Sequence, residues 1–253
     1  MSKTAAIIPA RWGSTRFPGK ALHPIAGKPL VQHVWERTMG AAAIDSVIIA
    51  TDDMRIADAA FAFGAEVSLT SPNHVSGTDR IAEVARKLPA AFTRIINVQG
   101  DEPVVDPALI SRLAKTLAAD PKIPMITAAN PFAPGEDPAN PNAVKVVLDR
   151  AGDALYFSRS PVPYPRDKGI VADSGKGTAA TYYRHQGIYG YTRKFLLEFI
   201  RWKPGALEKT EQLEQLRALE NGAKIRVLIT KKASIGVDTP DDVRFAEASL
   251  KKL

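Results

Sequence analysis

Short apolar runs alternate with amphipathic stretches along the first half of this 253-residue chain. The apolar runs are rich in valine and isoleucine, which is typical of β-strands. The stretches between them carry apolar residues at helical spacing, such as Leu30 and Val34. We predict strands at residues 4–10, 46–51, 66–70, 94–99 and 124–130, and helices at residues 29–41, 54–64, 78–88 and 107–119.

This alternation predicts an α/β fold in which a mostly parallel central sheet carries helices on both faces. Right-handed crossovers between parallel strands bring their carboxyl ends to one edge of the sheet. Ligands of open α/β sheets bind at that edge. The conspicuous polar motifs of this chain follow predicted strands, so we expect them to gather there.

The pattern changes after residue 130, where several prolines precede shorter apolar runs. The segment at 160–184 is dense in proline, glycine and charge, which indicates a lid or a binding loop, and we expect 160–183 to be mobile. The length suits one large α/β domain with a small subdomain. We predict further strands at 143–149, 154–159, 185–192 and 224–230, helices at 193–202 and 209–222, and a final helix within 236–252.

Composition narrows the function classes. The chain has no cysteine, which excludes disulfides, thiolate metal sites and a cysteine nucleophile. No apolar stretch is long enough to span a bilayer and residues 1–10 carry no secretory signal, so we expect a cytoplasmic protein without a membrane partner. The net charge of +7 favours an anionic partner. Because the basic residues form no long block and no aromatic-interleaved motif, we predict a phosphorylated small molecule and no nucleic acid.

A cationic loop follows the first predicted strand. Arginine offers fork-shaped donors to phosphate oxygens, lysine offers a mobile charge, and glycine lets backbone N–H groups come close. The glycines at 13 and 19 match neither the Walker A spacing nor GxGxxG, which argues against ATPase and NAD-dehydrogenase functions. We predict that this loop binds a polyphosphate through Arg11, Ser14, Arg16 and Lys20.

Two acidic motifs are candidate metal ligands. Asp101 and Glu102 come directly after the strand at 94–99, and Mg²⁺ commonly takes one or two protein carboxylates together with substrate phosphates. The alternative is that both residues cap the following turn. Asp238 also follows a strand, but from spacing alone it is equally well explained as part of the cap of the last helix.

The remaining polar motifs are scattered and do not define a substrate by themselves. The segment Ser76–Arg80 places hydroxyls and a glycine at a helix start, a position suited to an anion or a nucleobase edge. A lone histidine in a strand is as often structural as it is a ligand, and polar residues on an amphipathic helix are usually solvated. The first alternative applies to His185 and the second to Glu214 and Gln215, while Arg159 and Tyr189 stand in the motifs YFSR and RHQGIY.

Taken together, the motifs resemble the 3-deoxy-manno-octulosonate (Kdo) cytidylyltransferase family, the CMP-Kdo synthetases of Gram-negative bacteria. The resemblance covers essentially the whole chain, and the combination of motifs is far more specific than any one of them. The matching segments, in family order, are IPARWGSTRFPGK, ATDD, SGTDR, NVQGDEP, NPNAVKVV, YFSR, RHQGIYGY, LEQLRALENG and GVDTPDD.

The resemblance implies transfer of a cytidylyl group from CTP to Kdo, giving CMP-Kdo and pyrophosphate for lipopolysaccharide synthesis with Mg²⁺ as cofactor. It also implies a single Rossmann-like nucleotidyltransferase domain over 1–253, in which 131–192 includes a β-rich dimerisation subdomain and the mobile loop, and hence a homodimer. The alternatives for the acceptor are a related acid such as 8-amino-Kdo or a sialic acid.

The family's functional residues carry over to matching positions of this sequence. The loop residues Arg11, Ser14, Arg16 and Lys20 would hold the CTP phosphates, and Lys20 would also be catalytic. Asp101 and Asp238 would be catalytic metal ligands. The cytidine side would comprise Ser76, Thr78, Arg80 and Gln99, and the sugar acid would contact Arg159, His185, Tyr189, Glu214 and Gln215.

Overall fold

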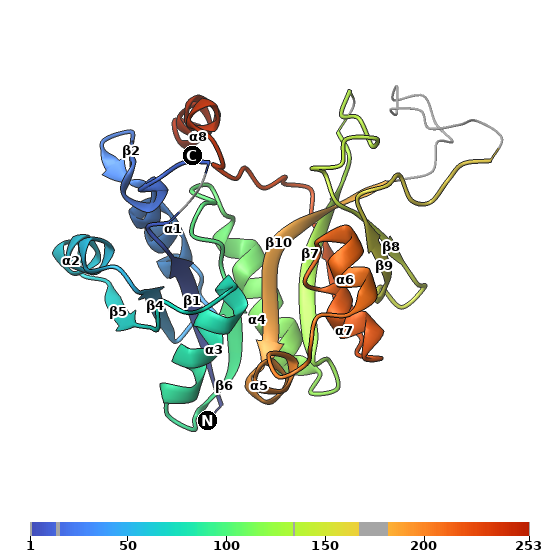
Figure 1. Cartoon of the computed structure of the whole chain (residues 1–253), viewed down its shortest axis with the longest axis horizontal. Coiled ribbons are helices and arrows are strands. Elements are labelled where there is room, and N and C mark those ends of the chain that lie inside the picture. The colour runs from blue at the N-terminus through green and yellow to red at the C-terminus, as the bar shows by residue number, and fades with distance from the viewer. Residues whose placement is uncertain (1, 14–15, 134, 167–181, 253) are drawn as a thin grey trace. The chain divides into compact units, whose positions relative to one another are not determined.

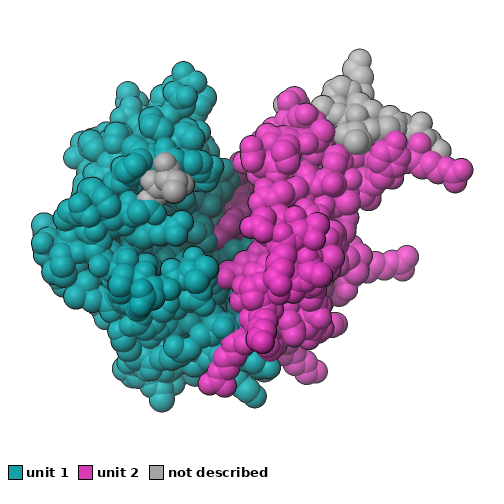
Figure 2. Space-filling model, in the orientation of Figure 1, with its two compact units in different colours: residues 1–121, 188–200, 234–253 teal, residues 122–187, 201–233 magenta. Residues whose placement is uncertain are grey.

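The computed structural model describes residues 2–13, 16–133, 135–166 and 182–252 (Figure 1). They form two compact units, coloured separately in Figure 2. Unit 1 comprises residues 1–121, 188–200 and 234–253, and unit 2 comprises residues 122–187 and 201–233. The predictions for Ser14 and for most of the mobile loop at 160–183 lie outside the described residues.

The sheet of unit 1 is mostly parallel. β1 pairs in parallel with β4 on one side and with β6 on the other, and β5 extends the sheet beyond β4. On the other side of β6, the Tyr189–Thr192 part of β10 pairs antiparallel. The strands are β1 (Lys3–Ala10), β4 (Ser46–Thr51), β5 (Glu66–Leu69), β6 (Phe92–Asn97) and β10 (Tyr183–Thr192).

Helices cover both faces of this sheet. α3 packs against α5, α1 packs against α4, and the two pairs lie on opposite faces (Figure 1). Almost every residue of β1 and β4 is therefore buried, as in other parallel sheets. The helices of unit 1 are α1 (Leu30–Met39), α2 (Met54–Ala62), α3 (Gly77–Lys87), α4 (Pro107–Ala119), α5 (Arg193–Phe199) and α8 (Val243–Leu250), with 3₁₀ turns η1 (Lys20–Leu22) and η2 (Pro240–Asp242) and a small hairpin of β2 (Pro24–Ile25) and β3 (Lys28–Pro29).

Unit 2 combines parallel and antiparallel pairs. β7 (Met125–Pro131) pairs in parallel with β11 (Ile225–Ile229). β8 (Lys145–Leu148) pairs antiparallel with β9 (Ala154–Ser158) and with the start of β10. Two short helices complete the unit, α6 (Ala206–Glu211) and α7 (Leu216–Glu220).

The predicted fold class is confirmed: the chain is α/β with a mostly parallel sheet and helices on both faces. The predicted strands and the first four helices lie within about two residues of the observed bounds, which is where boundary predictions are least certain. The assignment of one domain with a β-rich subdomain inside 131–192 stays a prediction; that span holds β8, β9 and β10. No helix among the described residues is long and apolar enough to cross a membrane.

One predicted helix is wrong. Residues 209–222 do not form a single helix, because α6 ends at Glu211 and the next residue, Gln212, has a left-handed backbone with φ of 53°. The guanidinium of Arg159 binds the carbonyl oxygens of Glu211 and Gln212 at 2.7 and 3.3 Å, so those carbonyls accept bonds from a side chain rather than from a following helical turn. The predicted final helix is also shorter than expected, spanning Val243–Leu250 after η2.

Candidate active site

A polar pocket of about 350 Å³ lies in unit 1, at the carboxyl ends of β1 and β6. This is the edge at which the sequence predicts the functional residues to meet. The lining includes predicted residues from four separate stretches of the chain: Arg11, Arg16, Lys20, Ser76, Arg80, Gln99, Asp101 and Asp238.

The cationic loop is shaped by the indole of Trp12. Gly19 donates its N–H to the carbonyl of Trp12 at 3.2 Å and has a left-handed φ of 70°. A Cβ at Gly19 would lie 3.1 Å from the indole, so both the backbone angle and the space require glycine. On Trp12, the guanidinium of Arg55 stacks 3.5 Å from the ring centroid. The loop is therefore held by packing and by this cation–π contact.

A small apolar cluster joins this loop to the C-terminal part of unit 1. Phe17, Ile25, Leu30, Val237 and Ala246 are all buried together. Two of these residues are the immediate neighbours of Arg16 and Asp238. Burial of the apolar neighbours thus brings two polar residues far apart in the sequence to the same place, where the Arg16 guanidinium lies 3.1 Å from the Asp238 carboxylate.

Lys20 bridges the two predicted metal ligands. Its Nζ donates to Asp101 Oδ2 at 2.7 Å and to Asp238 Oδ1 at 3.3 Å. The backbone adds a further link, because Val237 donates its N–H to the carbonyl of Asp101 at 2.8 Å. Two carboxylates therefore converge on one cation, with side chains that are 32% and 50% exposed and so accessible to a ligand.

The structure shows which residues cap the turn that follows Asp238. The cap of η2 is made by Thr239 and Asp242, which form a reciprocal capping box. Asp242 also accepts the Asp238 N–H at 3.0 Å. Burial by itself raises the pKa of Asp242, but these hydrogen bonds outweigh it and lower the pKa. The Asp238 side chain is thus not the cap and faces Lys20 and Arg16 instead.

Gly100 permits the close approach of two strand ends. A Cβ at this position would lie 2.6 Å from the carbonyl oxygen of Pro9, a distance that real Cβ contacts do not reach. The obstacle is backbone, which cannot move aside as a flexible side chain would. Since Gly100 precedes Asp101 and Pro9 precedes the cationic loop, this contact sets how near the loop lies to the carboxylate.

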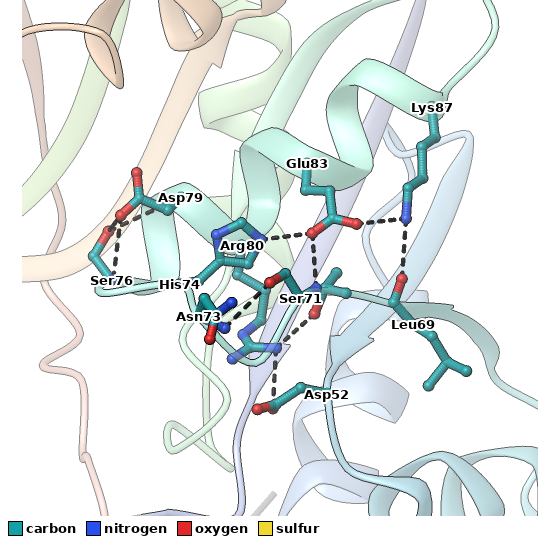
Figure 3. A network of polar contacts seen from close by, with 11 residues as sticks. Asp52, Leu69, Ser71, Asn73, His74, Ser76, Asp79, Arg80, Glu83 and Lys87 are labelled. Carbon is teal, nitrogen blue, oxygen red and sulfur yellow. Dashed lines mark hydrogen bonds and ion pairs between the residues drawn. The ribbon is translucent and has the colours of Figure 1, made fainter.

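The start of α3 and the loop before it also line the pocket. Figure 3 shows the polar contacts that join them. Ser76 and Asp79 form a capping box at the helix N-terminus. Arg80 is 4% exposed and its guanidinium binds Thr70 Oγ1 at 2.5 Å and Asp52 Oδ1 at 3.0 Å. Thr78 is equally buried in the first turn of α3, but unlike Ser76 and Arg80 it does not line the pocket.

Sequence reasoning missed Asp52 and His74. The ATDD motif, which directly follows a strand, was a usable signal for Asp52, whose carboxylate orients Arg80. His74 lines the pocket next to Val75 and binds Glu83 on α3. No spacing rule identifies His74, because the histidine and its partner are joined only when the loop folds back onto the helix.

The predicted sugar-acid residues lie in unit 2, except Tyr189, which pairs with Asn97 in unit 1. Arg159 is a structural centre of unit 2, because its guanidinium also binds the carbonyl of Pro141 and its backbone N–H donates to Glu211. Glu214 lies 3.6 Å from Arg217. The Gln215 side chain is buried, and its Nε2 has no hydrogen-bond partner among the described residues.

His185 also belongs to unit 2, and its Nε2 lies 3.0 Å from Thr127 Oγ1. Desolvation by the surrounding protein lowers the pKa of its imidazole to about 3. The imidazole is therefore neutral near pH 7 and acts as a hydrogen-bonding group rather than as a cation.

Comparisons with known proteins identify similar chains along nearly the full length. A family model described as Cytidylyltransferase matches residues 5–225. A 3-deoxy-manno-octulosonate cytidylyltransferase of Geobacter metallireducens is 54% identical over 243 residues, covering 95% of each chain. A second protein with the same description, from Syntrophotalea carbinolica, is 49% identical over 248 residues, which covers 98% of each chain.

Solved structures agree with these matches. A CMP:2-keto-3-deoxy-manno-octonic acid synthetase complexed with CTP superposes with a TM-score of 0.90 at 41% identity, covering 99% of both chains. A 4-diphosphocytidyl-2C-methyl-D-erythritol synthase of Anaerococcus prevotii superposes with a TM-score of 0.65 at 14% identity, covering 99% of this chain and 96% of that one. The second match shows a shared fold only.

We predict that Gly100→Ala disrupts the pocket. The added methyl must displace the Pro9 backbone, so we expect a loss of about 2 kcal/mol in the free energy of unfolding, measured by denaturant titration. Gly236→Ala is the matched control, because a Cβ there meets nothing within 4 Å. Equal stability of the two variants would contradict this account.

We predict that His185 stays neutral down to about pH 4. The folded protein has a pKa of about 3 at this site and the unfolded chain about 6.5, so the unfolded state binds the proton first as the pH falls. His185 should therefore make the unfolding free energy fall by up to about 1.4 kcal/mol per pH unit below pH 6.5. Side-chain NMR, with His185→Gln to assign the signal, measures the titration directly, and an ordinary midpoint near 6.5 would refute the prediction.

Proposed function

This chain belongs to the 3-deoxy-manno-octulosonate cytidylyltransferase family, and we propose that its unit 1 pocket binds CTP for transfer of the cytidylyl group to Kdo. The products are CMP-Kdo and pyrophosphate. The observation that carries this proposal is the convergence of Lys20 with Asp101 and Asp238 beside the arginines of the cationic loop. A triphosphate needs cationic contacts and a divalent ion, and this pocket offers groups for both.

The residues fit Mg²⁺ as the cofactor. Asp101 and Asp238 supply hard oxygen donors that already converge on one ammonium group. No cluster of three or more His, Cys, Asp or Glu side chains suited to a metal occurs in the described part of the chain. Two carboxylates suit an ion that completes its shell with water and phosphate oxygens. When bound there, Mg²⁺ would supply positive charge to the phosphates and lower the pKa of the attacking hydroxyl.

The chain's own residues would then act by positioning and charge neutralisation. The anomeric C2 hydroxyl of Kdo attacks the α-phosphorus in line, a new C–O–P link forms, and the bond to pyrophosphate breaks. A chain without cysteine offers no thiolate for a covalent intermediate, which favours direct displacement. Arg11, Arg16 and Lys20 would hold the leaving pyrophosphate and neutralise its growing charge. The ammonium group of Lys20 also contacts Asp101 and Asp238, so a triphosphate bound there would compete with these carboxylates for it.

For the sugar acid, we propose contacts with a second set of residues, most of them in unit 2. The unsatisfied Gln215 amide would donate to a sugar oxygen, and neutral His185 would hydrogen-bond a hydroxyl. Arg159, Tyr189 and Glu214 would complete the set, Arg159 mainly by holding the turn that carries Gln215. A sialic acid or 8-amino-Kdo remains the alternative acceptor, since neither contact by itself distinguishes the C8 substituent.

We further propose a homodimer that works in the cytoplasm and feeds lipopolysaccharide synthesis. The family resemblance supports all three statements. The lack of cysteine is compatible with a reducing compartment. Sedimentation equilibrium of the purified protein measures the oligomeric state.

Pyrophosphate release tests the function. We expect release with CTP, Mg²⁺ and Kdo, much slower release with a sialic acid, and a rate with 8-amino-Kdo that identifies the preferred acceptor. A matched reaction with UTP in place of CTP controls for nucleotide choice. If no acceptor gave pyrophosphate, the cytidylyltransferase proposal would be wrong.

We predict that Asp101→Asn lowers kcat at least about 100-fold while the protein stays folded. The substitution removes the charge that faces Lys20 and would hold Mg²⁺, but it leaves a partly exposed side chain of the same size. Asp241→Asn is the matched control, an exposed carboxylate near Asp238 that lines no part of the pocket. Steady-state kinetics at varied Mg²⁺ and thermal unfolding check this, and near wild-type turnover of Asp101→Asn would remove Asp101 from the metal site.

A further inference from the structure

The loop between β5 and α3 is tied to the helix that follows it by a polar network (Figure 3). Glu83 on α3 is the centre of this network. Its Oε2 accepts the Ser71 N–H at 2.9 Å and lies 2.6 Å from His74 Nε2, and its Oε1 accepts from Lys87 at 2.6 Å. Burial alone raises the pKa of Glu83, but the three partners outweigh it and bring the pKa to about 2.

An ionised Glu83 fixes the orientation of the imidazole. A carboxylate only accepts hydrogen bonds, so His74 must donate its Nε2–H to Glu83. The two side chains are 18% and 22% exposed, which leaves the ring little freedom to turn. His74 also lines the pocket, so its ring is held rigidly at the pocket wall. Glu83 binds the Nε2 atom of the ring and makes no bond to Nδ1.

The neighbouring residue indicates which part of the nucleotide meets this wall. Val75 lines the same pocket and is 89% exposed, the highest value for a large apolar side chain among the described residues. A triphosphate has no apolar surface to cover such a side chain, whereas a ribose or a pyrimidine ring has. The cations that suit phosphate come from a different loop, at residues 11–20.

We propose that His74 and Val75 form a nucleoside-contacting wall, in which His74 binds the nucleoside through its Nδ1 edge and Glu83 is the residue that positions it. The inference rests on the proposed function, because it assumes that CTP is the ligand of this pocket. The β5–α3 loop would thus contribute to affinity for the nucleoside and not to affinity for the phosphates.

Isothermal calorimetry with CTP and with inorganic tripolyphosphate separates the affinity for the nucleoside from the affinity for the phosphates. We expect His74→Ala to weaken CTP about tenfold, the loss of one good hydrogen bond, and to leave tripolyphosphate affinity unchanged. His74→Gln, whose amide retains polar contacts, should recover part of the CTP affinity. Glu83→Gln keeps the size of the side chain but removes its charge, so it should weaken CTP in the same direction.

Lys87→Ala is the matched control within the network. Lys87 binds Glu83 and the carbonyl of Leu69, but it is 53% exposed and lies outside the pocket lining. We expect wild-type affinity for both ligands in this variant. Arg16→Ala, by contrast, should weaken CTP and tripolyphosphate alike.

Three results would overturn the inference: CTP affinity of His74→Ala within twofold of wild type, an equal loss of tripolyphosphate affinity, or a loss in Lys87→Ala as large as in Glu83→Gln. The last two would show that the network merely maintains the loop. A wild-type protein that binds tripolyphosphate but not CTP would overturn the proposed function itself, which is a different outcome.

Discussion

The nucleotide pocket depends on one backbone hydrogen bond, from Val237 N–H to the carbonyl of Asp101. This bond places the segment that carries Asp238 beside the end of β6. The Val237 side chain is meanwhile buried with Phe17 of the cationic loop. One residue thus fixes two components of the pocket, through its amide on one side and its side chain on the other. Lys20 then finds both carboxylates within reach.

The two sides of the pocket differ in how firmly their polar side chains are held. On the side of the cationic loop, the side chains of Arg16 and Asp238 are 66% and 50% exposed and can change partners when a ligand binds. On the side of α3, the polar side chains are held by partners within the protein. Asp52 and Thr70 bind Arg80, and Glu83 binds His74. An adaptable wall suits phosphates, whose charge is strong and spread over several oxygens. A rigid wall suits a nucleoside, where recognition depends on the position of a few atoms.

The sequence predicted much of the fold because alternating strands and helices leave a strong periodic signal, as in 107–119 for α4. It failed at 209–222, where Arg159, distant in the sequence, ends the helix at Glu211. It left Asp238 undecided because capping and metal binding use the same residue type, and only the folded structure shows that Thr239 and Asp242 form the cap. It missed His74, since the Glu83 contact exists only after the loop has folded. Helices and strands can be predicted from local sequence patterns, whereas side-chain partners that meet only in the folded chain cannot.

The distance along the chain between Asp101 and Val237 has a consequence for synthesis. During translation the strands β1, β4, β5 and β6 leave the ribosome first, together with the helices between them, and can begin to pair. At that stage Lys20 and Asp101 already exist, but their third partner has not been made. The site therefore matures in a late step, when the segment around Val237 reaches the apolar cluster of Phe17. A nascent chain that lacks this segment holds the cationic loop without the second carboxylate that contacts Lys20.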